Sequence, residues 1–358
     1  MSKPTHFDVL IVYNGTTATS ASDRKKSNVT PFPIHSKCSS RNNAYAYFLE
    51  SCVKQGLKAA FSTSNDIIGP GLCLSYWTYK NTEWHRSNKV AYSTTIFDKF
   101  SPRSKAGKLK HQLLFSSNDI RPFNNPTLRK LFSDKQNTYN SLKGHAIPTI
   151  PLIGKSLANM TNACSKLSAT MSTHYGNDDF SSDIIMKDRY GAGGYHVYKF
   201  SPGESIQMHK ITTLYPDISF ILQPFANSSE PTDIRLVYLG GKIVDSYIRV
   251  AKQNDFRCNE HQGGTLTYLD IKNIPKILIL KANAIIAKLN NHHSLYSLDF
   301  MISDSGNPYL LEGNIGPGID WNLSVKNEEV KAKKFIRNIV KNLSKRKLGV
   351  TPQLLQTA

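Results

Sequence analysis

Cysteine is scarce in this sequence and shows no pairing pattern. Five cysteines are spread over 358 residues, and no two of them form a C-x-x-C pair. An odd number without this spacing argues against a disulfide framework and against a structural zinc site. We therefore expect the protein to work in a reducing compartment, the cytoplasm.

Long hydrophobic runs are also missing. No stretch approaches 18 uncharged apolar residues, and Met1 to His6 do not form an apolar signal segment. These absences predict a protein without a transmembrane helix or a secretion signal. Hydrophobic residues still make up 39% of the chain and aromatic residues 10%, which is enough for the cores of two or three domains.

Acidic residues are few relative to basic ones. Lys and Arg number 45 against 26 Asp and Glu, which gives a formal net charge of +19. Such an excess attracts polyanions, among them nucleic acids, ribosomes, anionic lipids and phosphorylated ligands. The basic residues form only mild clusters, at 24–26, 105–110 and 331–347, and no RNA-binding aromatic motif accompanies them. Nucleic-acid binding is therefore not the expected main function.

The periodicity of the apolar residues predicts a mixed α/β (α+β) fold. A strand–helix–strand pattern over residues 8–13, 42–56 and 57–62 suggests a small α/β domain, which a strand at 93–100 extends. Residues 14–40 are polar and are expected to form a mobile loop. Strands and hairpins begin at 183, and further helices are predicted at 134–142, 159–175, 273–291 and 328–346.

The segment 296–316 carries the clearest chemical signal. Two apolar runs flank the turn sequence S-D-S-G-N, which predicts a β-hairpin. A hairpin centred between Ser305 and Gly306 would place Asp299 opposite Glu312, with Asn314 on the same face. Two opposed, buried carboxylates repel each other unless a cation lies between them, and carboxylate and amide oxygens suit Mg²⁺. The alternative is a solvated hairpin end with incidental acids.

A glycine-rich turn follows another predicted strand, which ends at Lys187. The sequence K-D-R-Y-G-A-G-G places Gly191, Gly193 and Gly194 after this lysine. Glycines let backbone N–H groups approach phosphate oxygens, and a lysine at a strand end neutralises phosphate charge. The spacing matches neither a Walker loop nor a dinucleotide-binding fingerprint. An ordinary hairpin turn is therefore the alternative.

Two further segments offer contacts to a nucleotide. The apolar strand 220–225 ends at a proline and would present backbone groups to an adenine edge, although a core strand leaving its sheet is an equal alternative. A hairpin further on delivers Arg249, and the loop after it carries Arg257, Asn259 and His261. Two arginines and an asparagine that converge on a loop suit a transferring phosphoryl group. A charged surface loop is the alternative, and His261 is interpreted as non-catalytic.

The order of these signals resembles the ATP-grasp superfamily, in particular the branch with the glutathione synthetases and the RimK-like ribosomal-protein glutamate ligases. In that branch a segment like D-I-R-x-x-Y-x-G-G-K-I-V precedes F-R-x-N-x-H-x-G-G, and the metal motif ends in E-x-N-x-x-P-G. This sequence carries these motifs in the same order, between residues 134 and 320. The resemblance implies an ATP-grasp fold in which two α+β subdomains hold ATP. A glycine-rich lid would lie in residues 123–222, the metal site and a basic C-terminal helix in 223–358, and a preceding small α/β domain in 1–122.

The resemblance also implies roles for individual residues. Lys135 and Lys187 match phosphate-binding lysines. The hinge that holds adenine is matched by Gln223, Pro224 and Phe225, with the proline in place of the usual acid. The remaining matches are Asp233 near the ribose, Arg257 at the phosphates, Arg249 and Asn259 at the phosphoryl and acyl-phosphate groups, and Asp299, Glu312 and Asn314 at magnesium.

These matches imply an ATP- and Mg²⁺-dependent ligase, with Mn²⁺ as an alternative ion. It would join a carboxylate to an amine (or a thiol) through an acyl-phosphate and release ADP and phosphate. Small-molecule or peptide substrates fit, the basic surface favours an acidic or ribosome-associated acceptor, and loops such as 201–210 are expected to shape the substrate pockets. One rival is a nucleotide-binding regulator on the same fold, which would bind ATP without ligation. Another is a nucleic-acid-binding protein, whose affinity would fall steeply with salt and ignore ATP.

Overall fold

The chain divides into two compact units in a computed structural model. The first unit comprises residues 1–125, 293–295 and 316–358, and the second comprises 126–292 and 296–315. Within the part of the chain that is described, no helix is long and apolar enough to cross a membrane. The basic cluster predicted at 24–26 lies outside the described residues. The structure describes residues 3–23, 29–100, 102, 104–174, 179–228, 232–290, 294–321 and 327–348.

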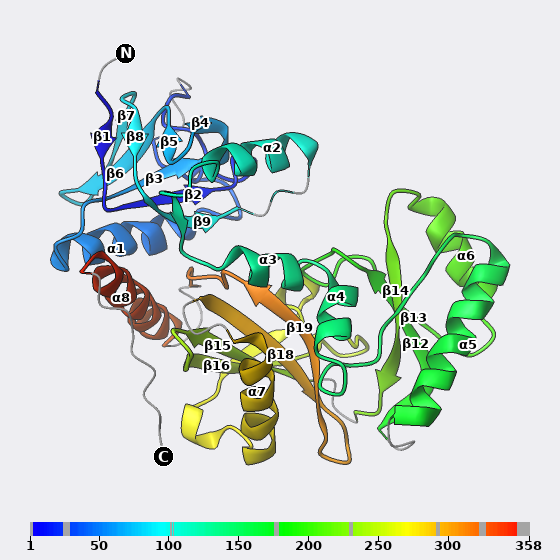
Figure 1. The fold of residues 1–358 in the computed structure, drawn as a ribbon. Coiled ribbons are helices and arrows are strands. Elements are labelled where there is room, and N and C mark those ends of the chain that lie inside the picture. The colour runs from blue at the N-terminus through cyan, green and yellow to red at the C-terminus, as the bar shows by residue number, and fades with distance from the viewer. Residues whose placement is uncertain are drawn as a thin grey trace. The chain divides into compact units, whose positions relative to one another are not determined.

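The first unit is built on a six-stranded sheet in the order β10-β9-β2-β3-β6-β7 (Figure 1). Strands β10, β9, β2 and β3 run parallel, and β6 and β7 form an antiparallel hairpin at one edge. A second, smaller sheet has the order β1-β8-β5-β4. The elements are β1 (Thr5–His6), β2 (Val9–Tyr13), α1 (Arg41–Lys54), β3 (Ala59–Thr63), β4 (Ile67–Gly69), β5 (Leu72–Cys73), β6 (Tyr76–Lys80), β7 (Glu83–Ser87), β8 (Ala91–Tyr92), β9 (Thr95–Lys99), α2 (Lys105–Leu114), β10 (Arg121–Pro122) and α8 (Glu328–Lys347), with a 3-10 turn at Ser64–Asp66.

The predicted strand–helix–strand opening is confirmed by β2, α1 and β3. The first four residues of β2 are buried, as expected of a parallel strand that is covered on both faces. After α1, Gly56 adopts a positive φ of 67°, which only glycine adopts readily at the end of a helix. Val53 was expected on the buried side of α1 but is 68% exposed, because it lies about 100° around the helix from buried Cys52.

The segment between β2 and α1 is anchored by one large apolar side chain. Phe32 is fully buried, and its backbone N–H and C=O both bond to the side chain of Asn42. The indole N–H of Trp77 also donates to the carbonyl of Thr19. The described parts of residues 14–40 contain no helix or strand, as predicted, but they contribute to the core of this unit.

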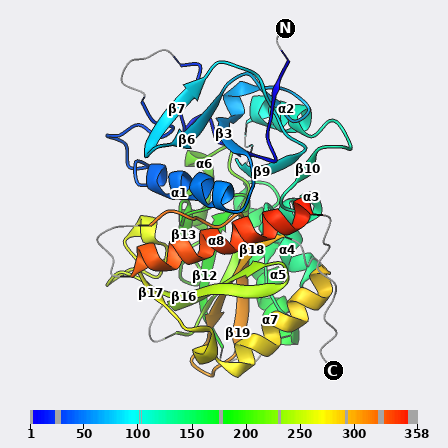
Figure 2. The ribbon, with the colours of Figure 1, turned by 90° about the vertical axis from the view of Figure 1, so that its left-hand side faces the viewer.

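Helix α8 lies beside α1 within the first unit (Figure 2). Its predicted apolar face is confirmed, since Phe335, Ile336, Ile339, Val340 and Leu343 are all buried. The spacing of three and four residues between these side chains keeps them on one side of the helix. The C-terminal segment therefore completes the first unit, although it follows the second unit in the sequence.

The second unit holds two antiparallel sheets, β11-β14-β12-β13 and β17-β16-β15-β18-β19. Helices α5 and α6 pack on the first of these sheets (Figure 1), where Met160, Met186 and Leu222 are buried together. Helix α7 packs on the second through Leu278, Ala282 and other buried residues. The elements are α3 (Pro126–Phe132), α4 (Lys135–Ser141), β11 (Ile150–Pro151), α5 (Leu157–His174), β12 (Phe180–Asp188), β13 (Val197–Phe200), α6 (Ser205–Leu214), β14 (Phe220–Ala226), β15 (Thr232–Leu239), β16 (Lys242–Val250), β17 (Thr265–Tyr268), α7 (Lys276–Leu289), β18 (Leu295–Ile302) and β19 (Pro308–Ile315), with 3-10 turns at Glu260–Gln262 and Ile271–Asn273.

Two local expectations for this unit were wrong. Residues 201–210 were expected to form a loop, but α6 begins at Ser205 and buries Met208 and Thr212. Strand β14 was expected to end at its proline, but it continues through Pro224 to Ala226. Strand β11 pairs with β14 only at Ile221 and Leu222, so beyond them β14 has one free edge, where a residue without an N–H is tolerated.

Candidate active site

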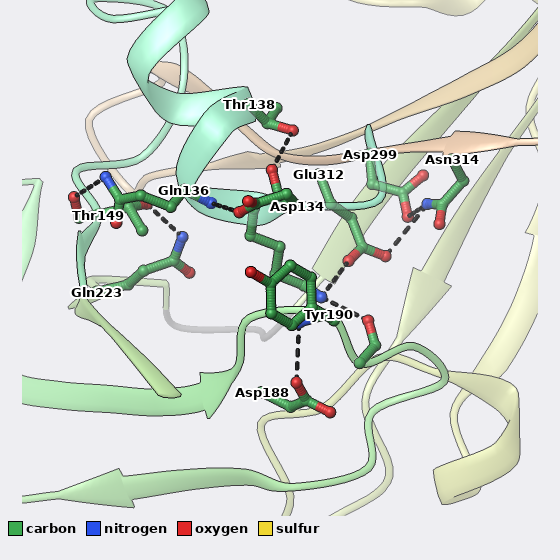
Figure 3. Close-up of polar contacts among 12 residues, drawn as sticks. Asp134, Gln136, Thr138, Thr149, Asp188, Tyr190, Gln223, Asp299, Glu312 and Asn314 are labelled. Atoms are coloured by element: carbon green, nitrogen blue, oxygen red, sulfur yellow. Dashed lines mark hydrogen bonds and ion pairs between the residues drawn. The ribbon is translucent and has the colours of Figure 1, made fainter. Parts of the chain in front are cut away.

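The hairpin of β18 and β19 pairs Asp299 with Glu312, as predicted, but nearer the turn its register is centred on Ser305 and not between Ser305 and Gly306. The pairing shifts by one residue between Asp299 and Phe300, which brings the two acids opposite each other across the strands. Asn314 lies on the same face, and its amide nitrogen is 3.2 Å from Oε1 of Glu312 and 3.4 Å from Oδ2 of Asp299 (Figure 3). The hairpin thus brings all three residues predicted for magnesium together.

Asp299 is almost completely buried and is held by two arginines. Arg235 donates from Nε and Nη2 to the two carboxylate oxygens, at 2.5 Å each. Arg249 donates from Nη2 to Oδ2 of the same carboxylate at 2.9 Å, and from Nε to Asp233 at 2.7 Å. Bidentate pairing with a guanidinium fixes both the position and the orientation of a carboxylate. Strands β15, β16 and β18 therefore share one buried ion-pair network.

This network drives the pKa values of its two acids apart. Burial alone would raise the pKa of Asp299, but Arg235 and Arg249 outweigh that effect and lower it. The pKa of Asp233 is raised to about 6, because burial and the charge of Asp299 outweigh the attraction of Arg249. At neutral pH Asp299 is therefore fully anionic, whereas Asp233 begins to take up a proton just below neutrality.

Lys187 lies near the end of β12 and is buried, with only 9% of the residue exposed. Its ammonium group makes no hydrogen bond or ion pair with any residue that the structure describes. Burial, together with the charge of Lys135, lowers the pKa of Lys187 to about 8. Lys135 begins α4, donates to the carbonyl of Gly191 at 2.5 Å and lies 3.9 Å from Glu312. A buried ammonium group without a partner is unfavourable unless an anion binds there.

The glycine-rich turn between β12 and β13 packs closely on the loop that carries Asn259. Gly193 and Gly194 have positive φ values of 71° and 73°. The carbonyl of Gly193 accepts a hydrogen bond from Gln262 at 3.2 Å. A Cβ atom at Gly194 would lie 2.7 Å from Oδ1 of Asn259, so a larger residue would push the turn and the loop apart. Glycine is required here for both conformation and space.

The residues predicted to hold adenine, Gln223, Pro224 and Phe225, lie on strand β14. Gln223 is buried, and its amide donates to the hydroxyl of Thr149 at 2.8 Å. Gln136 donates to the backbone carbonyl of the same threonine at 3.1 Å (Figure 3). These two bonds tie β14 to the segment after α4 and set the position of Pro224 and Phe225, which follow Gln223.

The side chains described above line one cavity of the second unit. Its volume, including the space at its opening, is about 1040 Å³, which suits a small-molecule ligand. Every residue predicted for the site lines the cavity except Asn314, which bonds to two of the lining acids instead. Apolar side chains complete the lining, among them Ile147, Ile185, Met301 and Leu311.

The charges around this cavity are balanced. Four cationic side chains and four anionic side chains line it, so the lining alone does not favour a free polyanion such as ATP. A divalent cation among the acids would shift the balance in favour of a triphosphate. The cations are Lys135, Lys187, Arg249 and Arg257, and the anions are Asp188, Asp233, Asp299 and Glu312.

The residues present fit a magnesium ion, although few donors are available. Among the described residues, no group of three or more His, Cys, Asp or Glu is placed to hold a metal, so Asn314 would have to be a ligand. Glu312 is the more accessible acid, whereas Asp299 would exchange one arginine contact for the ion. Rotating the amide of Asn314 would present its oxygen instead of its nitrogen. Such a set, completed by waters and phosphate oxygens, is typical of Mg²⁺.

Some functional residues were not predicted from the sequence. Arg235 is the main partner of Asp299. It could have been predicted from the motif D-I-R, because Asp233 and Arg235 lie two residues apart in a strand and therefore share one face. Asp134 caps α4 by accepting from the backbone N–H of Gln136, and it also binds Arg189 through two bonds of 2.7 Å. This cap holds Lys135 at the first turn of its helix.

Comparison with protein-family models finds a RimK-like ATP-grasp domain over residues 134–339. This match covers more than half of the chain, and the chain belongs to the RimK-like ATP-grasp family. The resemblance seen in the sequence is thereby confirmed.

Among curated relatives, a probable alpha-L-glutamate ligase of Pasteurella multocida (strain Pm70) is 25% identical over 289 residues, covering 76% of this chain and 84% of the relative. A probable alpha-L-glutamate ligase of Histophilus somni (strain 2336) is 27% identical over 139 residues. That alignment covers 39% of this chain and 44% of the relative, so it spans less than half of the relative's length. The expected enzyme class, a ligase, agrees with the names of both relatives.

The solved structures that resemble this chain include ATP-grasp ligases, a macrocyclase and two synthetases. D-alanyl-alanine synthetase A from Vibrio cholerae O1 biovar eltor has a TM-score of 0.58 at 13% identity, covering 96% of this chain and 99% of that one. The ATP-grasp ligase PsnB, complexed with a precursor variant, Mg and ADP, has a TM-score of 0.54 at 8% identity, covering 96% and 100%. At such low identities the likeness shows the fold alone, and it confirms the expected fold class.

Replacing Lys187 by methionine should weaken ATP binding and remove its dependence on pH. In the unchanged protein the ammonium loses its proton as the pH rises through about 8, so ATP affinity should fall above that value. The lowered pKa also means that the unfolded state binds the proton more tightly, so stability should rise with pH from about 8 to 10.5. ATP affinity and melting temperature would be measured on both sides of pH 8.

Lys242→Met is the matched control for this experiment. Lys242 is exposed at the start of strand β16 and does not line the cavity. Its loss should leave ATP affinity and the pH dependence unchanged. The same pH dependence in Lys187→Met as in the unchanged protein would contradict a phosphate-binding role for Lys187.

The glycine-rich turn is expected to close over bound nucleotide. Glycine allows the backbone more conformations at Gly193 and Gly194 than other residues would, and a reactive acyl-phosphate needs protection from water. Hydrogen exchange of residues 188–195 should therefore slow when ATP and Mg²⁺ are added. The turn at Gly240 and Gly241 does not line the cavity and serves as the control. Equal exchange at 188–195 with and without saturating nucleotide would argue against a lid.

Proposed function

We propose that this protein is an ATP- and Mg²⁺-dependent carboxylate–amine ligase that works through an acyl-phosphate. The observation that carries the proposal is the buried ammonium of Lys187, which has no hydrogen-bond or ion-pair partner among the described residues and shares one cavity with the Asp299–Glu312 pair and with Arg249. The cationic side chains suit the phosphates of a nucleoside triphosphate, and the two acids suit the metal ion bound to it. The named relatives and the family assignment support the same class of reaction.

Four side chains would bind and orient the nucleotide. Lys135 and Lys187 would hold phosphate oxygens, and Gln223 and Phe225 would lie beside the adenine. Asp299, Glu312 and Asn314 would hold magnesium, which supplies positive charge to the phosphates when it is bound. In the proposed division into α+β subdomains of residues 123–222 and 223–358, residues from both ranges would contact the nucleotide.

The reaction itself requires positive charge at the transferred group. A carboxylate oxygen of the acid substrate attacks the γ-phosphorus, the bond to the β-phosphate oxygen breaks, and ADP leaves. Arg249 would stabilise the charge on the transferred phosphoryl group, with Asn259 as a donor to the acyl-phosphate. An amine then attacks the acyl carbon, loses a proton, and displaces phosphate to leave an amide.

The proposal extends to substrates and location. The relatives are named as glutamate ligases, so we propose an amino acid as one substrate and a small molecule or peptide as the other. The net charge of +19 favours an acidic or ribosome-associated acceptor. The scarcity of cysteine favours the cytoplasm. Mn²⁺ is proposed as an ion that substitutes for Mg²⁺, because it takes the same oxygen ligands.

The nucleotide products test this mechanism directly. A screen of acids and amines with ATP and Mg²⁺ should identify a pair that forms an amide, with ADP and phosphate released in equal amounts. Lys135, Lys187 and Arg249, together with a bound magnesium ion, would favour attack at the γ-phosphorus, whereas adenylation would give AMP and pyrophosphate. AMP as the stoichiometric product would overturn the acyl-phosphate mechanism. Tight ATP binding without any ligation would favour a regulatory protein.

A further inference from the structure

Strand β13 lies at the edge of the sheet β11-β14-β12-β13 in the second unit and pairs only with β12. The N–H of Asp188 donates to the C=O of His196 at 3.1 Å, so these residues form a hydrogen-bonded pair just before β13 begins. Hydrogen-bonded and non-hydrogen-bonded pairs alternate along an antiparallel ladder. The next pair, Lys187 with Val197, is therefore non-hydrogen-bonded, and the backbone N–H and C=O of Val197 point away from β12.

The same alternation turns the backbone N–H and C=O of Lys199 outward, whereas those of Tyr198 and Phe200 face β12. Among the described residues, no group bonds to the outward backbone atoms of Val197 or Lys199. Unpaired groups of this kind at a strand edge are a template on which another extended chain can pair. The edge therefore offers two N–H and two C=O groups to an added strand.

A groove of about 1070 Å³, including the space at its opening, follows this edge, and every residue of β13 lines it. Helix α6 forms one wall of the groove. Phe200 of β13 and Met208 of α6 are buried in the same core, so α6 covers the face of the strand that carries Phe200. Gln207, Lys210 and Ile211 of this helix line the groove.

The loop of residues 254–257 forms the second wall, on the opposite face of β13. Lys199 lies on that face, because neighbouring residues of a strand point to opposite sides of the sheet. Its Nζ lies 3.8 Å from the centre of the Phe225 ring, and Phe225 packs on Phe256 of the loop, with ring centres 5.9 Å apart. The open strand edge thus forms the floor of the groove, between a helix and a loop.

The lining of this groove is positively charged. It contains Lys199, Lys210 and Arg257, against a single acid, Asp255. Arg257 is paired with Asp255 at 2.8 Å. Lys199 is paired with Asp183 at 2.9 Å, whereas Lys210 is exposed and has no ion-pair partner among the described residues. A segment with acidic side chains complements this charge better than a neutral or basic one.

We propose that the groove along β13 binds an extended, acidic segment of a partner polypeptide, which adds a strand to the sheet at this edge. The backbone of the segment bonds to the outward groups of Val197 and Lys199, and its acidic side chains lie near Lys210. Val197, Phe256 and Arg257 line both this groove and the cavity described above, so the docked segment ends beside that cavity. The proposal goes beyond the ligase function, because strand addition requires neither ATP nor a reacting group on the partner.

The test is a binding measurement on the full chain with a short synthetic peptide of alternating threonine and glutamate, acetylated and amidated at its ends. The same peptide with lysine in place of glutamate should bind at least about tenfold more weakly. Hydrogen exchange at Val197 and Lys199 should slow when the acidic peptide binds, because their outward N–H groups become bonded. The N–H groups of Tyr198 and Phe200 already face β12 and serve as the internal control.

Two modified peptides separate strand addition from charge attraction. Each carries N-methyl groups on alternate residues, so that one peptide loses the N–H groups on one edge of the strand and the other peptide loses those on the opposite edge. One of them should bind about tenfold or more weakly and the other nearly normally, because only one edge bonds to β13. Equal losses in both peptides would show that no strand is added and would overturn the proposal.

Two pairs of protein variants test the surface itself. Lys199→Pro removes an outward N–H at an edge position, where proline is tolerated, and Lys199→Ala removes the same side chain but keeps the N–H. The proline variant should bind the peptide at least about fivefold more weakly than the alanine variant. Lys210→Glu should weaken binding about fivefold or more at low salt. Lys288→Glu is its control, since Lys288 is exposed on α7, which packs on the other sheet.

Three results would overturn the docking surface. They are the absence of peptide binding, binding without slower exchange at Val197 and Lys199, and displacement of the peptide by a single-stranded oligonucleotide that binds more tightly. The last result would assign the positive groove to a nucleic acid. All these measurements are made without nucleotide, so a failure to bind ATP or to form an amide would count against the ligase function alone.

Discussion

Glu312→Gln is expected to reduce ATP-dependent amide formation at least about a hundredfold while leaving the fold intact. Glutamine keeps the size of the side chain and an oxygen atom, so the packing of β19 should not change. It removes the negative charge that would hold Mg²⁺ beside Asp299 and leaves Lys135 without its nearest anion, 3.9 Å away. Phosphate release and its dependence on Mg²⁺ concentration would be measured with a substrate pair at saturation.

Asp304→Asn is the matched control for this change. It makes the same exchange of carboxylate for amide in the same hairpin, but Asp304 lies in the exposed turn and does not line the cavity. Its activity and Mg²⁺ dependence should equal those of the unchanged protein. Normal turnover by Glu312→Gln at ordinary Mg²⁺ concentrations would refute the metal assignment.

Arg249→Met should lower kcat by about a hundredfold or more, with a smaller rise in KM for ATP. The reason is that the contact between Arg249 and the transferred phosphoryl group matters most in the transition state. The same change leaves Asp233 buried without its partner, which should also destabilise the protein by about 3–5 kcal/mol. Steady-state kinetics and thermal unfolding would measure the two effects separately.

The loss of stability in Arg249→Met should depend on pH. Asp233 already has its pKa raised to about 6, above the value of 3.8 for the unfolded chain. A raised acid pKa means that the folded state binds the proton more tightly, so stability falls as the pH rises through this range. Without Arg249 the pKa should rise further. The variant should therefore lose less stability at a pH below 6 than at neutral pH.

Two other variants separate catalysis from stability. Arg249→Lys restores the charge but not the two-sided contact with Asp233 and Asp299, so it should recover stability more than kcat. Arg257→Met removes a partly exposed pair with Asp255 and should change stability by less than about 1 kcal/mol. A kcat for Arg249→Met close to that of the unchanged protein would exclude Arg249 as the residue at the phosphoryl group.

Local pattern is enough to predict several parts of the site. The turn sequence of the β18–β19 hairpin and the two-residue period of strands predict a hairpin with Asp299 and Glu312 facing each other, and this pair is confirmed. The one-residue shift between Asp299 and Phe300 that brings the two acids opposite each other was not predicted. The apolar face of α8 follows from its helical spacing in the same way. Long-range features do not follow from such patterns. Strands β4 to β8 were not predicted, because they are short and show no clear alternation.

The sequence by itself determined the family, the order of the motifs and the pair of Asp299 and Glu312, because these depend on short motifs along the chain. Only the tertiary structure decided which distant charges meet. It placed Arg235 on Asp299 from another strand, and it buried Lys187 without a hydrogen-bond or ion-pair partner among the described residues. It also brought Arg41 to Asp320 across 279 positions of the chain. Such contacts depend on how sheets and helices pack, and packing follows from the whole chain's burial of apolar surface rather than from any local pattern.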